Sequence, residues 1–297
     1  MSIGYVYTHG VALLGNSNGV TRQANGNFGF DLNLVPPDRQ TDPAFGGSFT
    51  QATVNLPNGK SYIVPEFEAI DGLVSTDFAA INAVDNSGTS VYHGMLLSLR
   101  HQSGQFLGAV AYTFSKAIDQ GTGYMNQFDQ ASQRGPSQLD QTHRLVLSGT
   151  WSPMMRGLKG LTVSSVVTVA SGRPYTAVFD TSNVNFSIVP GEGFNSFRGP
   201  GVRDMDLSVA RIFKLNERFG LKLRAEAFNL LNHANFQQNA VDNVEYTTVQ
   251  QCTPLNDPNC TPLPIWDASV NTDFGHPLFA APKYGSRNIQ LSARFVF

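Results

Sequence analysis

Asp140, His143 and Ser148 are the residue types of a nucleophilic triad, and they lie close together in the sequence. A triad needs its base within hydrogen-bond reach of both the nucleophile and the acid. Apolar and polar residues alternate through this segment as they do in a β-strand, and in a strand His143 and Ser148 project from opposite faces. The spacing therefore excludes this triad. Nothing else in the chain favours catalysis, and we predict that the protein is not an enzyme.

The histidines and cysteines do not indicate a metal site. The six histidines are scattered, without an HExxH motif or a close His/Cys cluster, so we predict no metal and no other cofactor. The two cysteines, Cys252 and Cys260, bracket a short polar segment. In an oxidising compartment they would form a disulfide that staples a loop. The alternative is a pair of free thiols.

Charged residues recur at every second position in several segments, so in a strand they would share one face. These side chains could contact a ligand, or they could form a ladder of paired charges across neighbouring strands. The candidates for ligand contact are Arg144, Asp206, Lys222, Arg224, Glu226 and Arg294.

The last segment of the chain shows which elements would position these charges. In Asn288–Phe297, apolar side chains of one parity alternate with polar side chains of the other. The polar set is too hydrophilic for a packed interior. The pattern fits a membrane β-strand, whose apolar face meets lipid and whose polar face meets a water-filled lumen.

Seven more segments show a similar alternation, which gives about eight membrane strands near the roughly 10 residues that a tilted spanning strand needs. The predicted strands are Ser2–Thr8, Val91–His101, Phe106–Ser115, His143–Ser152, Leu161–Ala170, Arg203–Phe213, Phe219–Asn229 and Asn288–Phe297. Short turns alternate with long polar loops between them, as in outer-membrane barrels. The predicted fold is therefore all-β, an antiparallel transmembrane barrel region with short periplasmic turns and long extracellular loops.

The arginines test this assignment. Arg100, Arg144, Arg224 and Arg294 fall on the lumen parity, and a cation that faced lipid at mid-membrane would cost roughly 2–4 kcal/mol. Two further arginines, Arg203 and Arg211, have the lipid parity. Both lie near strand ends, so we predict that they are interfacial.

Some loop segments also carry local patterns. Phe28, Phe30, Leu32 and Leu34 alternate and predict a small hairpin inside the first long loop, and Asp77–Val84 could form a helical turn or two. Arg224–Phe236 could be an amphipathic helix by propensity, but the alternation before it favours a strand.

Composition agrees with the membrane assignment and excludes other classes. Only 14% of the 297 residues are charged, against roughly 25% in soluble domains, and no run approaches the roughly 18 apolar residues of a membrane helix. The net charge of −2, without a basic block, argues against a nucleic-acid partner. Met1 leads directly into a strand pattern without a signal peptide, so we expect the chain to be a C-terminal piece of a longer exported protein.

Several motifs resemble TonB-dependent outer-membrane receptors, in particular the Oar-like subgroup with an N-terminal carboxypeptidase-regulatory-like domain. The similar segments, in the same order, are Val91-Tyr92-His93, Tyr112-Thr113-Phe114-Ser115-Lys116-Ala117-Ile118-Asp119, Thr142-His143-Arg144-Leu145-Val146-Leu147-Ser148-Gly149, Ser171-Gly172-Arg173-Pro174-Tyr175, Arg224-Ala225-Glu226-Ala227-Phe228-Asn229-Leu230-Leu231-Asn232-His233, Asn235-Phe236, and Arg287 to Phe297. Together they cover nearly the whole chain.

The resemblance implies a barrel of about 22 strands around an N-terminal plug that couples to TonB. Residues 1–297 would be the C-terminal part of that barrel, with the plug domain and the signal peptide absent. Leu291, Phe295 and Phe297 match the C-terminal signal read by the barrel-assembly machinery. The implied partners are outer-membrane lipid, an unknown extracellular ligand and, in the full-length protein only, the plug and TonB. The lumen charges could contact the plug.

Two other functions fit parts of the sequence. A stand-alone small barrel, acting as an adhesin or structural anchor, would close on itself with eight strands. A soluble, secreted sugar-binding β-sandwich would bury its apolar faces in a packed core. The eight-strand fragment itself could be a small closed barrel or a curved open sheet.

Overall fold

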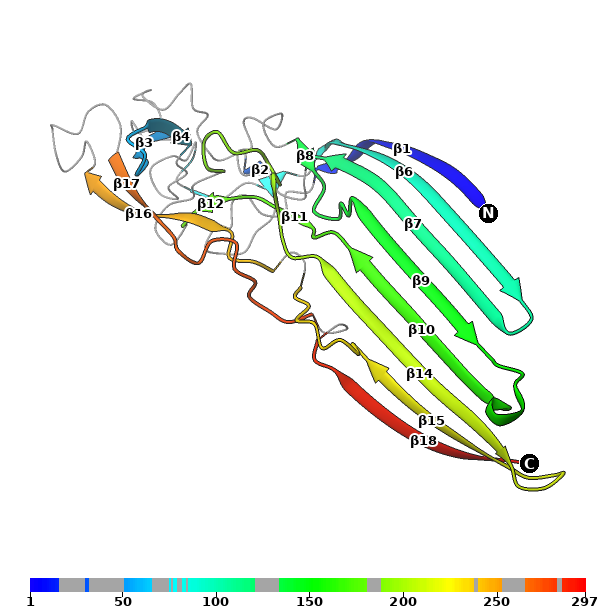
Figure 1. The fold of residues 1–297 in the computed structure, drawn as a ribbon. Helices are drawn as coiled ribbons and strands as arrows, with labels where there is room; N and C mark the ends of the chain where they lie inside the picture. The colour runs from blue at the N-terminus through cyan, green and yellow to red at the C-terminus, as the bar shows by residue number, and fades with distance from the viewer. Residues whose placement is uncertain are drawn as a thin grey trace.

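A computed structural model describes residues 1–15, 30–31, 51–65, 75, 77–78, 82–83, 85–120, 134–180, 188–237, 240–252, 265–281 and 285–297. Figure 1 shows a long curved antiparallel sheet with a smaller assembly of short strands at one end. We call these parts the wall and the cap. The cap lies at the end of the wall that carries the long connections, and both termini lie at the end with the short turns (Figure 1).

Eight strands form the wall in the order β1-β6-β7-β9-β10-β14-β15-β18, and β8 pairs with β7 beside this path. Their bounds are β1 Ser2–Gly15, β6 Asp85–Ser103, β7 Phe106–Asp119, β8 Gly135–Pro136, β9 His143–Trp151, β10 Leu161–Ala170, β14 Val202–Lys214, β15 Gly220–Phe228 and β18 Asn288–Val296. All eight predicted strands are confirmed. Of the segment Arg224–Phe236, the part up to Phe228 is a strand and the rest is turn and irregular backbone, so the helix alternative is wrong. β1 and β6 are longer than predicted, with 14 and 19 residues.

Each short connection has a local cause. Gly104, at φ 38°, occupies the tight turn between Ser103 and Phe106, which are paired. Asn216 closes the β14–β15 turn because its side-chain oxygen accepts hydrogen bonds from the backbone N–H groups of Arg218 and Phe219. The third connection contains a short 3₁₀ helix, Arg156–Leu158. The predicted turns are therefore confirmed.

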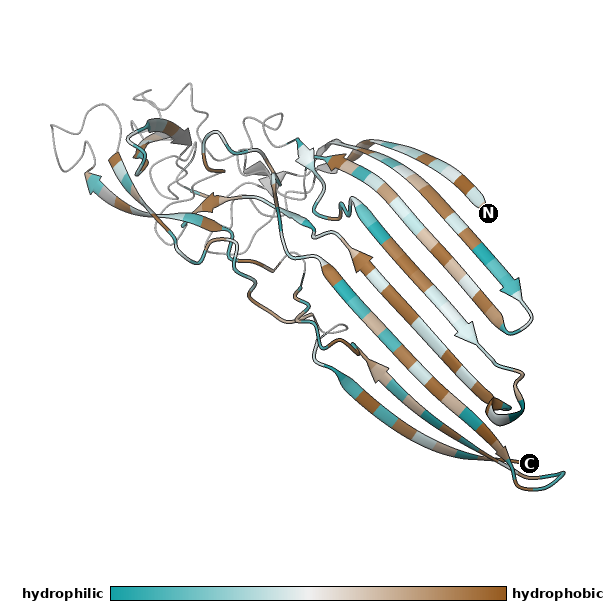
Figure 2. Cartoon of the chain, viewed as in Figure 1, coloured by the Kyte–Doolittle hydropathy of each residue, from teal (hydrophilic) through white to brown (hydrophobic). Residues whose placement is uncertain are grey.

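The register separates the two faces of the wall in continuous rows. One row across five neighbouring strands is wholly polar: Thr150, Ser164, Ser208, Glu226 and Gln290. The adjacent row across the same strands is wholly apolar: Trp151, Val163, Val209, Ala225 and Leu291. Figure 2 shows the resulting bands of brown and teal along the strands. We call these two surfaces the polar face and the apolar face.

The apolar face has no packed core over it in the described part of the chain. Leu147, Leu223 and Leu291 are 37%, 42% and 80% exposed, and Phe297 is 95% exposed. A soluble sheet would bury such residues against another layer. The wall leaves them available to lipid, as the alternation predicts.

The two arginines of the apolar parity lie at opposite ends of β14. Arg203 pairs with Val169 next to the cap. Arg211 lies near the short-turn end, where its guanidinium donates to the Gly157 carbonyl at 3.0 Å and stacks over the Phe213 ring at 5.1 Å. Their positions near strand ends are confirmed.

Aromatic side chains mark both ends of the apolar face. Toward the cap, Tyr112 and His143 form a hydrogen bond of 2.8 Å between the hydroxyl and Nδ1, so each polar tip has a partner. Toward the turns, Phe106 pairs with Trp151, and the Phe106 ring covers Gly108. Such bands resemble the aromatic girdles of membrane barrels.

The cap is built from segments that are far apart in the chain. Its five-stranded sheet has the order β12-β16-β17-β3-β4. The bounds of the cap strands are β2 Phe30–Asp31, β3 Gln51–Asn55, β4 Ser61–Pro65, β5 Asn82–Ala83, β11 Pro174–Tyr175, β12 Val178–Phe179, β13 Phe197–Arg198, β16 Val244–Cys252 and β17 Ile265–Val270. Its core contains Ala52, Val54, Leu56, Ala177, Phe179, Val189 and Trp266.

The cap corrects several loop predictions. The long loops after β10 and β15 contain β11–β13 and β16–β17, because their short apolar pieces bury one another in this core. Phe30–Asp31 pairs with Asn82–Ala83, far along the chain. Phe28, Leu32 and Leu34 lie outside the described residues, so the predicted hairpin stays a prediction. The same pairing makes residues 82–83 a strand, and the helical turn predicted there is wrong.

The wall is an open sheet in the described part of the chain. β1 pairs with β6 on one side only, and β18 pairs with β15 on one side only. The two strands lie at opposite edges of the wall (Figure 1). The eight strands therefore adopt the curved open sheet and not the closed small barrel.

No helix among the described residues has the length and apolar character needed to cross a membrane.

Substitution by arginine at two neighbouring residues of β9 distinguishes the faces. Leu147 belongs to the apolar face and Ser148 to the polar face. We expect Leu147→Arg to destabilise the protein in a bilayer by roughly 2–4 kcal/mol, since the cation would meet hydrocarbon, and Ser148→Arg to have little effect. Urea unfolding in lipid vesicles measures both variants. Equal effects would contradict the assignment of the faces.

Candidate functional site

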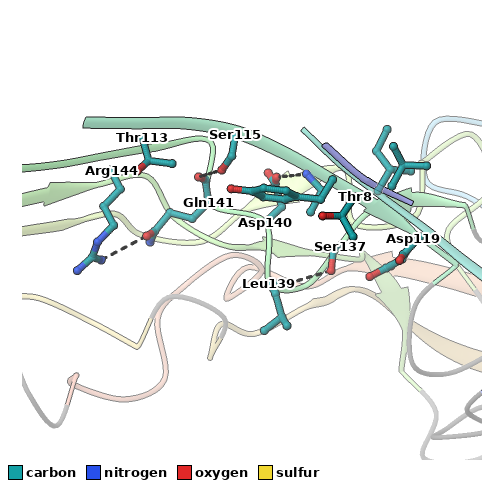
Figure 3. Close-up of a pocket in the computed structure, with 14 residues that line it drawn as sticks. Thr8, Thr113, Ser115, Asp119, Ser137, Leu139, Asp140, Gln141 and Arg144 are labelled. Atoms are coloured by element: carbon teal, nitrogen blue, oxygen red, sulfur yellow. Dashed lines mark hydrogen bonds between the residues drawn. The ribbon is translucent and has the colours of Figure 1, made fainter. Parts of the chain in front are cut away.

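A cavity of about 470 Å³ opens on the polar face where the wall meets the cap. Figure 3 shows its walls, which come from β1, β6, β7, the start of β9 and the segment before β9. We call it the mouth pocket. It is lined by Thr8, Ser90, Val91, Tyr92, Thr113, Ser115, Ala117, Ile118, Asp119, Ser137, Leu139, Asp140, Gln141 and Arg144. Six of these fourteen residues carry a hydroxyl group.

Register explains why these side chains meet. Thr8 pairs with Tyr92, and Tyr92 pairs with Ala117, so one row crosses three strands at the same height. Thr113, four residues before Ala117 on β7, pairs with Arg144 of β9. The pocket is therefore a product of the strand alternation, which puts every second residue of each strand on the polar face.

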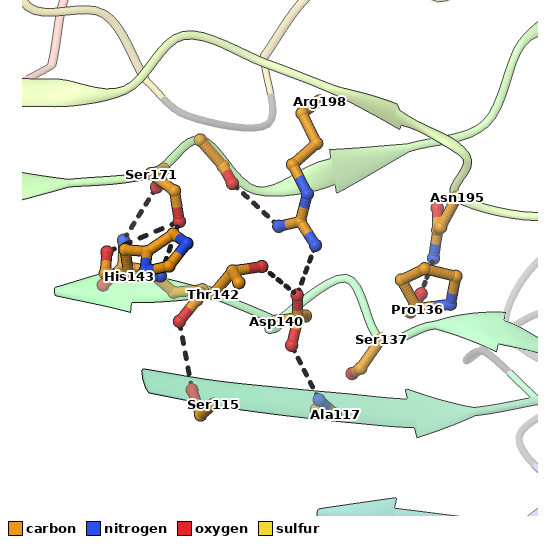
Figure 4. A network of polar contacts seen from close by, with 12 residues as sticks. Ser115, Ala117, Pro136, Ser137, Asp140, Thr142, His143, Ser171, Asn195 and Arg198 are labelled. Carbon is orange, nitrogen blue, oxygen red and sulfur yellow. Dashed lines mark hydrogen bonds and ion pairs between the residues drawn. The ribbon is translucent and has the colours of Figure 1, made fainter. Parts of the chain in front are cut away.

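Asp140 holds the outer rim of the pocket in place. Its side chain is 1% exposed, and its Oδ1 accepts a hydrogen bond from the Ala117 N–H at 2.6 Å. Its Oδ2 accepts from the Thr142 hydroxyl at 3.2 Å and forms an ion pair with Arg198 of β13. Figure 4 shows these contacts converging on one carboxylate. Asp140 thus ties together the wall, the segment before β9 and the cap.

A second polar anchor lies beside the first. The Asn195 amide donates to the Pro136 carbonyl at 2.8 Å, and its oxygen accepts from the Thr176 hydroxyl at 3.0 Å. Both Asn195 and Thr176 are buried. Close backbone packing accompanies these contacts, since a Cβ on Gly172 would lie 1.7 Å from the Gly199 carbonyl oxygen. Only glycine fits this position of the Ser171–Tyr175 motif.

The residues of the excluded triad point apart. His143 lies on the apolar face against Tyr112, and Ser148 lies on the polar face between Ala109 and Val166. The Asp140 carboxylate forms an ion pair with Arg198. The prediction that alternation separates His143 and Ser148 is confirmed, and the importance of Asp140 was missed because its partner Arg198 is distant in sequence.

The predicted charge candidates all share the polar face, but they do not form a complete ladder. Arg224 forms an ion pair with Glu226 at 2.6 Å and donates to the Ser208 hydroxyl at 3.0 Å. Lys222 lies directly opposite Arg294, so two like charges face each other. The predicted ladder is wrong at this pair. Like charges in opposed positions are unfavourable unless another group neutralises them.

The remaining candidates lie elsewhere. Asp206 accepts a hydrogen bond from the Asn229 N–H at 3.0 Å and so fixes the end of β15. Only Arg144 of the predicted set lines the mouth pocket.

Leu291 and Phe295 project from the apolar face of the edge strand, and Phe297 follows them. Cys252 is disulfide-bonded. Cys260 lies outside the described residues, so the predicted pairing of the two stays a prediction.

Comparison with known families agrees with this geometry. The family model described as outer membrane beta barrel domain matches residues 1–190 and 190–290. The chain belongs to this outer membrane beta barrel family. Searches of curated proteins and of solved structures gave no significant match.

Membership places this barrel protein in the bacterial outer membrane. The strands of the wall are then membrane strands, the cap lies on the extracellular side, and the short turns face the periplasm. The soluble β-sandwich is excluded, because the family is a membrane family and the described wall has no second layer.

The Glu245 carboxyl makes the stability of the cap depend on pH. Burial, with a further contribution from the negative charge of Glu192, raises the pKa of the Glu245 carboxyl in β16. Because the folded-state pKa is raised, the ionised form opposes folding of the cap. Stability is therefore higher below this pKa and falls as pH rises through it.

We expect Glu245→Gln to remove this pH dependence and to stabilise the cap at neutral pH. The fluorescence of Trp266, which is 2% exposed in the cap core, reports unfolding across a pH series. The exposed Glu217 of a periplasmic turn supplies the control, Glu217→Gln, which should keep the pH dependence. An unchanged profile in Glu245→Gln would contradict the assignment.

Removal of the Asp140 carboxylate should detach the cap from the wall. We expect Asp140→Ala to cost about 2–3 kcal/mol, since it leaves the Ala117 N–H and the Arg198 guanidinium without their partner. Thr142→Val, which removes one hydrogen bond of 3.2 Å, should cost less than about 1 kcal/mol. Urea unfolding in detergent measures both. Equal costs would show that Asp140 is not the anchor.

Proposed function

We propose that this protein forms the C-terminal part of the barrel wall of a TonB-dependent outer-membrane receptor, which takes up an extracellular ligand. The observation that carries the proposal is a wall of eight membrane strands with a charged polar face and two edges that have no partner strand among the described residues. Lipid cannot satisfy an exposed strand edge, so each edge needs a further strand. In this proposal the other strands of a larger barrel supply it.

The polar face supports a wide lumen. An eight-strand barrel is just wide enough for its own side chains to fill. Here Lys222 and Arg294 face each other as like charges, and Arg224 is 44% exposed. A filled interior would leave such cations without water. A wide bore keeps them hydrated or lets them contact an acidic partner.

The proposal assigns the partners that the resemblance implies. A plug would fill the bore and contact the cations on the polar face, and TonB would drive transport through that plug. The cap, which projects outside the membrane, would capture the ligand above the mouth pocket. Leu291, Phe295 and Phe297 would be read by the barrel-assembly machinery. The chain would have no catalytic role.

Disulfide trapping separates a large barrel from a closed eight-strand barrel. In a Cys252→Ser, Cys260→Ser background, Gly4→Cys of β1 is combined in turn with Ser292→Cys and Arg294→Cys of β18. We expect no disulfide between the two edges of one chain after oxidation in the outer membrane, because other strands lie between them. Ala225→Cys with Leu291→Cys, which are register partners, is the positive control. An edge-to-edge disulfide would support the stand-alone barrel instead.

Growth phenotypes test the transport step. We expect deletion of the gene segment that encodes β14–β18 to abolish growth on a subset of sole nutrient sources, and deletion of the TonB gene to abolish growth on the same subset. Nutrient arrays measure both strains, with each gene restored on a plasmid as the control. Growth losses that do not require TonB would overturn the proposed function.

A further inference from the structure

We infer that the mouth pocket is a binding site for an acidic saccharide, with Arg144 receiving the ligand carboxylate and the surrounding hydroxyls receiving its hydroxyl groups. This inference rests on the proposed receptor function and deepens it by naming the ligand class. It is argued from the free polar groups of the pocket, its aromatic surface and its available charge.

The pocket contains hydroxyl groups that the fold does not use. Among the described residues, the side chains of Thr8, Ser90, Tyr92 and Thr113 line the cavity without a hydrogen-bond partner. Each hydroxyl both donates and accepts. A matching ligand therefore carries several neighbouring groups that both donate and accept hydrogen bonds, as the hydroxyl groups of a sugar do.

The polar groups of the rim are already fixed by other contacts. The Ser115 hydroxyl donates to the Gln141 carbonyl at 3.0 Å, and the Ser137 hydroxyl accepts from the Leu139 N–H at 3.3 Å. Asp140 is bound by Arg198. These groups therefore shape the pocket, while the four free hydroxyls remain for a ligand. A site whose rim is held in place before binding loses less entropy on binding.

Tyr92 gives the pocket an aromatic surface. A Cβ on Gly94 would lie 2.6 to 2.9 Å from the outer atoms of the Tyr92 ring, so the ring lies over this glycine along β6. Since Tyr92 also lines the cavity, its ring offers an apolar surface beside the hydroxyls. A sugar ring presents the same combination of C–H groups and hydroxyls.

Arg144 supplies the positive charge. The Asp119 carboxylate also lines the cavity and already takes part in an interaction of its own. The Arg144 guanidinium has one contact among the described residues, with the Gln141 side-chain oxygen at 3.4 Å, which is too long for a strong bond. In Figure 3 this guanidinium lies at one end of the labelled residues, beside Gln141. A guanidinium can bind a carboxylate through two parallel hydrogen bonds. An acidic saccharide satisfies Arg144 and the hydroxyls together, whereas a neutral one leaves Arg144 without a partner.

The size of the cavity agrees with this ligand class. Pockets for small molecules have volumes of roughly 300–1,000 Å³, and the mouth pocket has about 470 Å³. It can hold one sugar unit at the end of a longer chain.

Binding of D-galacturonate and D-galactose, which differ in a carboxylate at one carbon, tests the inference. Calorimetry uses the protein extracted from outer membranes in detergent, with folding confirmed by heat-modifiable mobility. We expect galacturonate to bind at least about 10-fold more tightly than galactose, since only the acid pairs with Arg144. No preference for the acid would overturn the inference.

Variants locate the effect. Arg144→Gln should lower the affinity for galacturonate to about that for galactose, and Arg144→Lys should keep part of the preference for the acid because the charge remains. Thr113→Val should weaken binding of both sugars. Arg100→Gln, on the same polar face but outside the pocket, is the matched control and should change neither. A preference that survives in Arg144→Gln would refute the assigned site. The assay needs no TonB, so its failure is distinguishable from failure of the transport function.

Discussion

Hydrocarbon offers no hydrogen-bond partner to a peptide group, and the structure of this protein follows from that constraint. Each interior strand of the wall exchanges backbone hydrogen bonds with a neighbour on both sides. Pairing of adjacent strands puts successive side chains on opposite faces across the whole sheet. The same alternation that gives lipid an apolar surface therefore also collects Arg144, Thr113 and Tyr92 at one aqueous site.

The cap has the opposite physical basis. It lies outside the membrane, so it depends on burial in a small core around Phe179 and Trp266 and on polar contacts to the wall. Asp140 and Asn195 are the principal contacts, and both connect to segments distant in sequence. The outer rim of the mouth pocket is therefore held in place by a few buried hydrogen bonds. Its floor is formed by the membrane strands.

Sequence alone was sufficient for the wall and insufficient for the cap. Leu147 and Ser148 could be assigned to faces because a period of two persists through β9. Val178 and Phe179 could not be assigned, since two apolar residues have no period and their partner strand begins at Val244. The lumen parity of Arg144 was predictable, but its place in a pocket was not. The pocket also needs residues 137–141, which line it and are fixed by the ion pair between Asp140 and Arg198.

One edge of β18 has no partner strand in the described part of the chain, and this edge also matters before the protein reaches the membrane. All nine residues of β18 are exposed, and its alternating pattern presents apolar side chains together with open backbone groups. In water such a strand would template pairing with the same strand of another copy. Association between copies through this edge would rise with the concentration of the chain for as long as the edge stays uncovered.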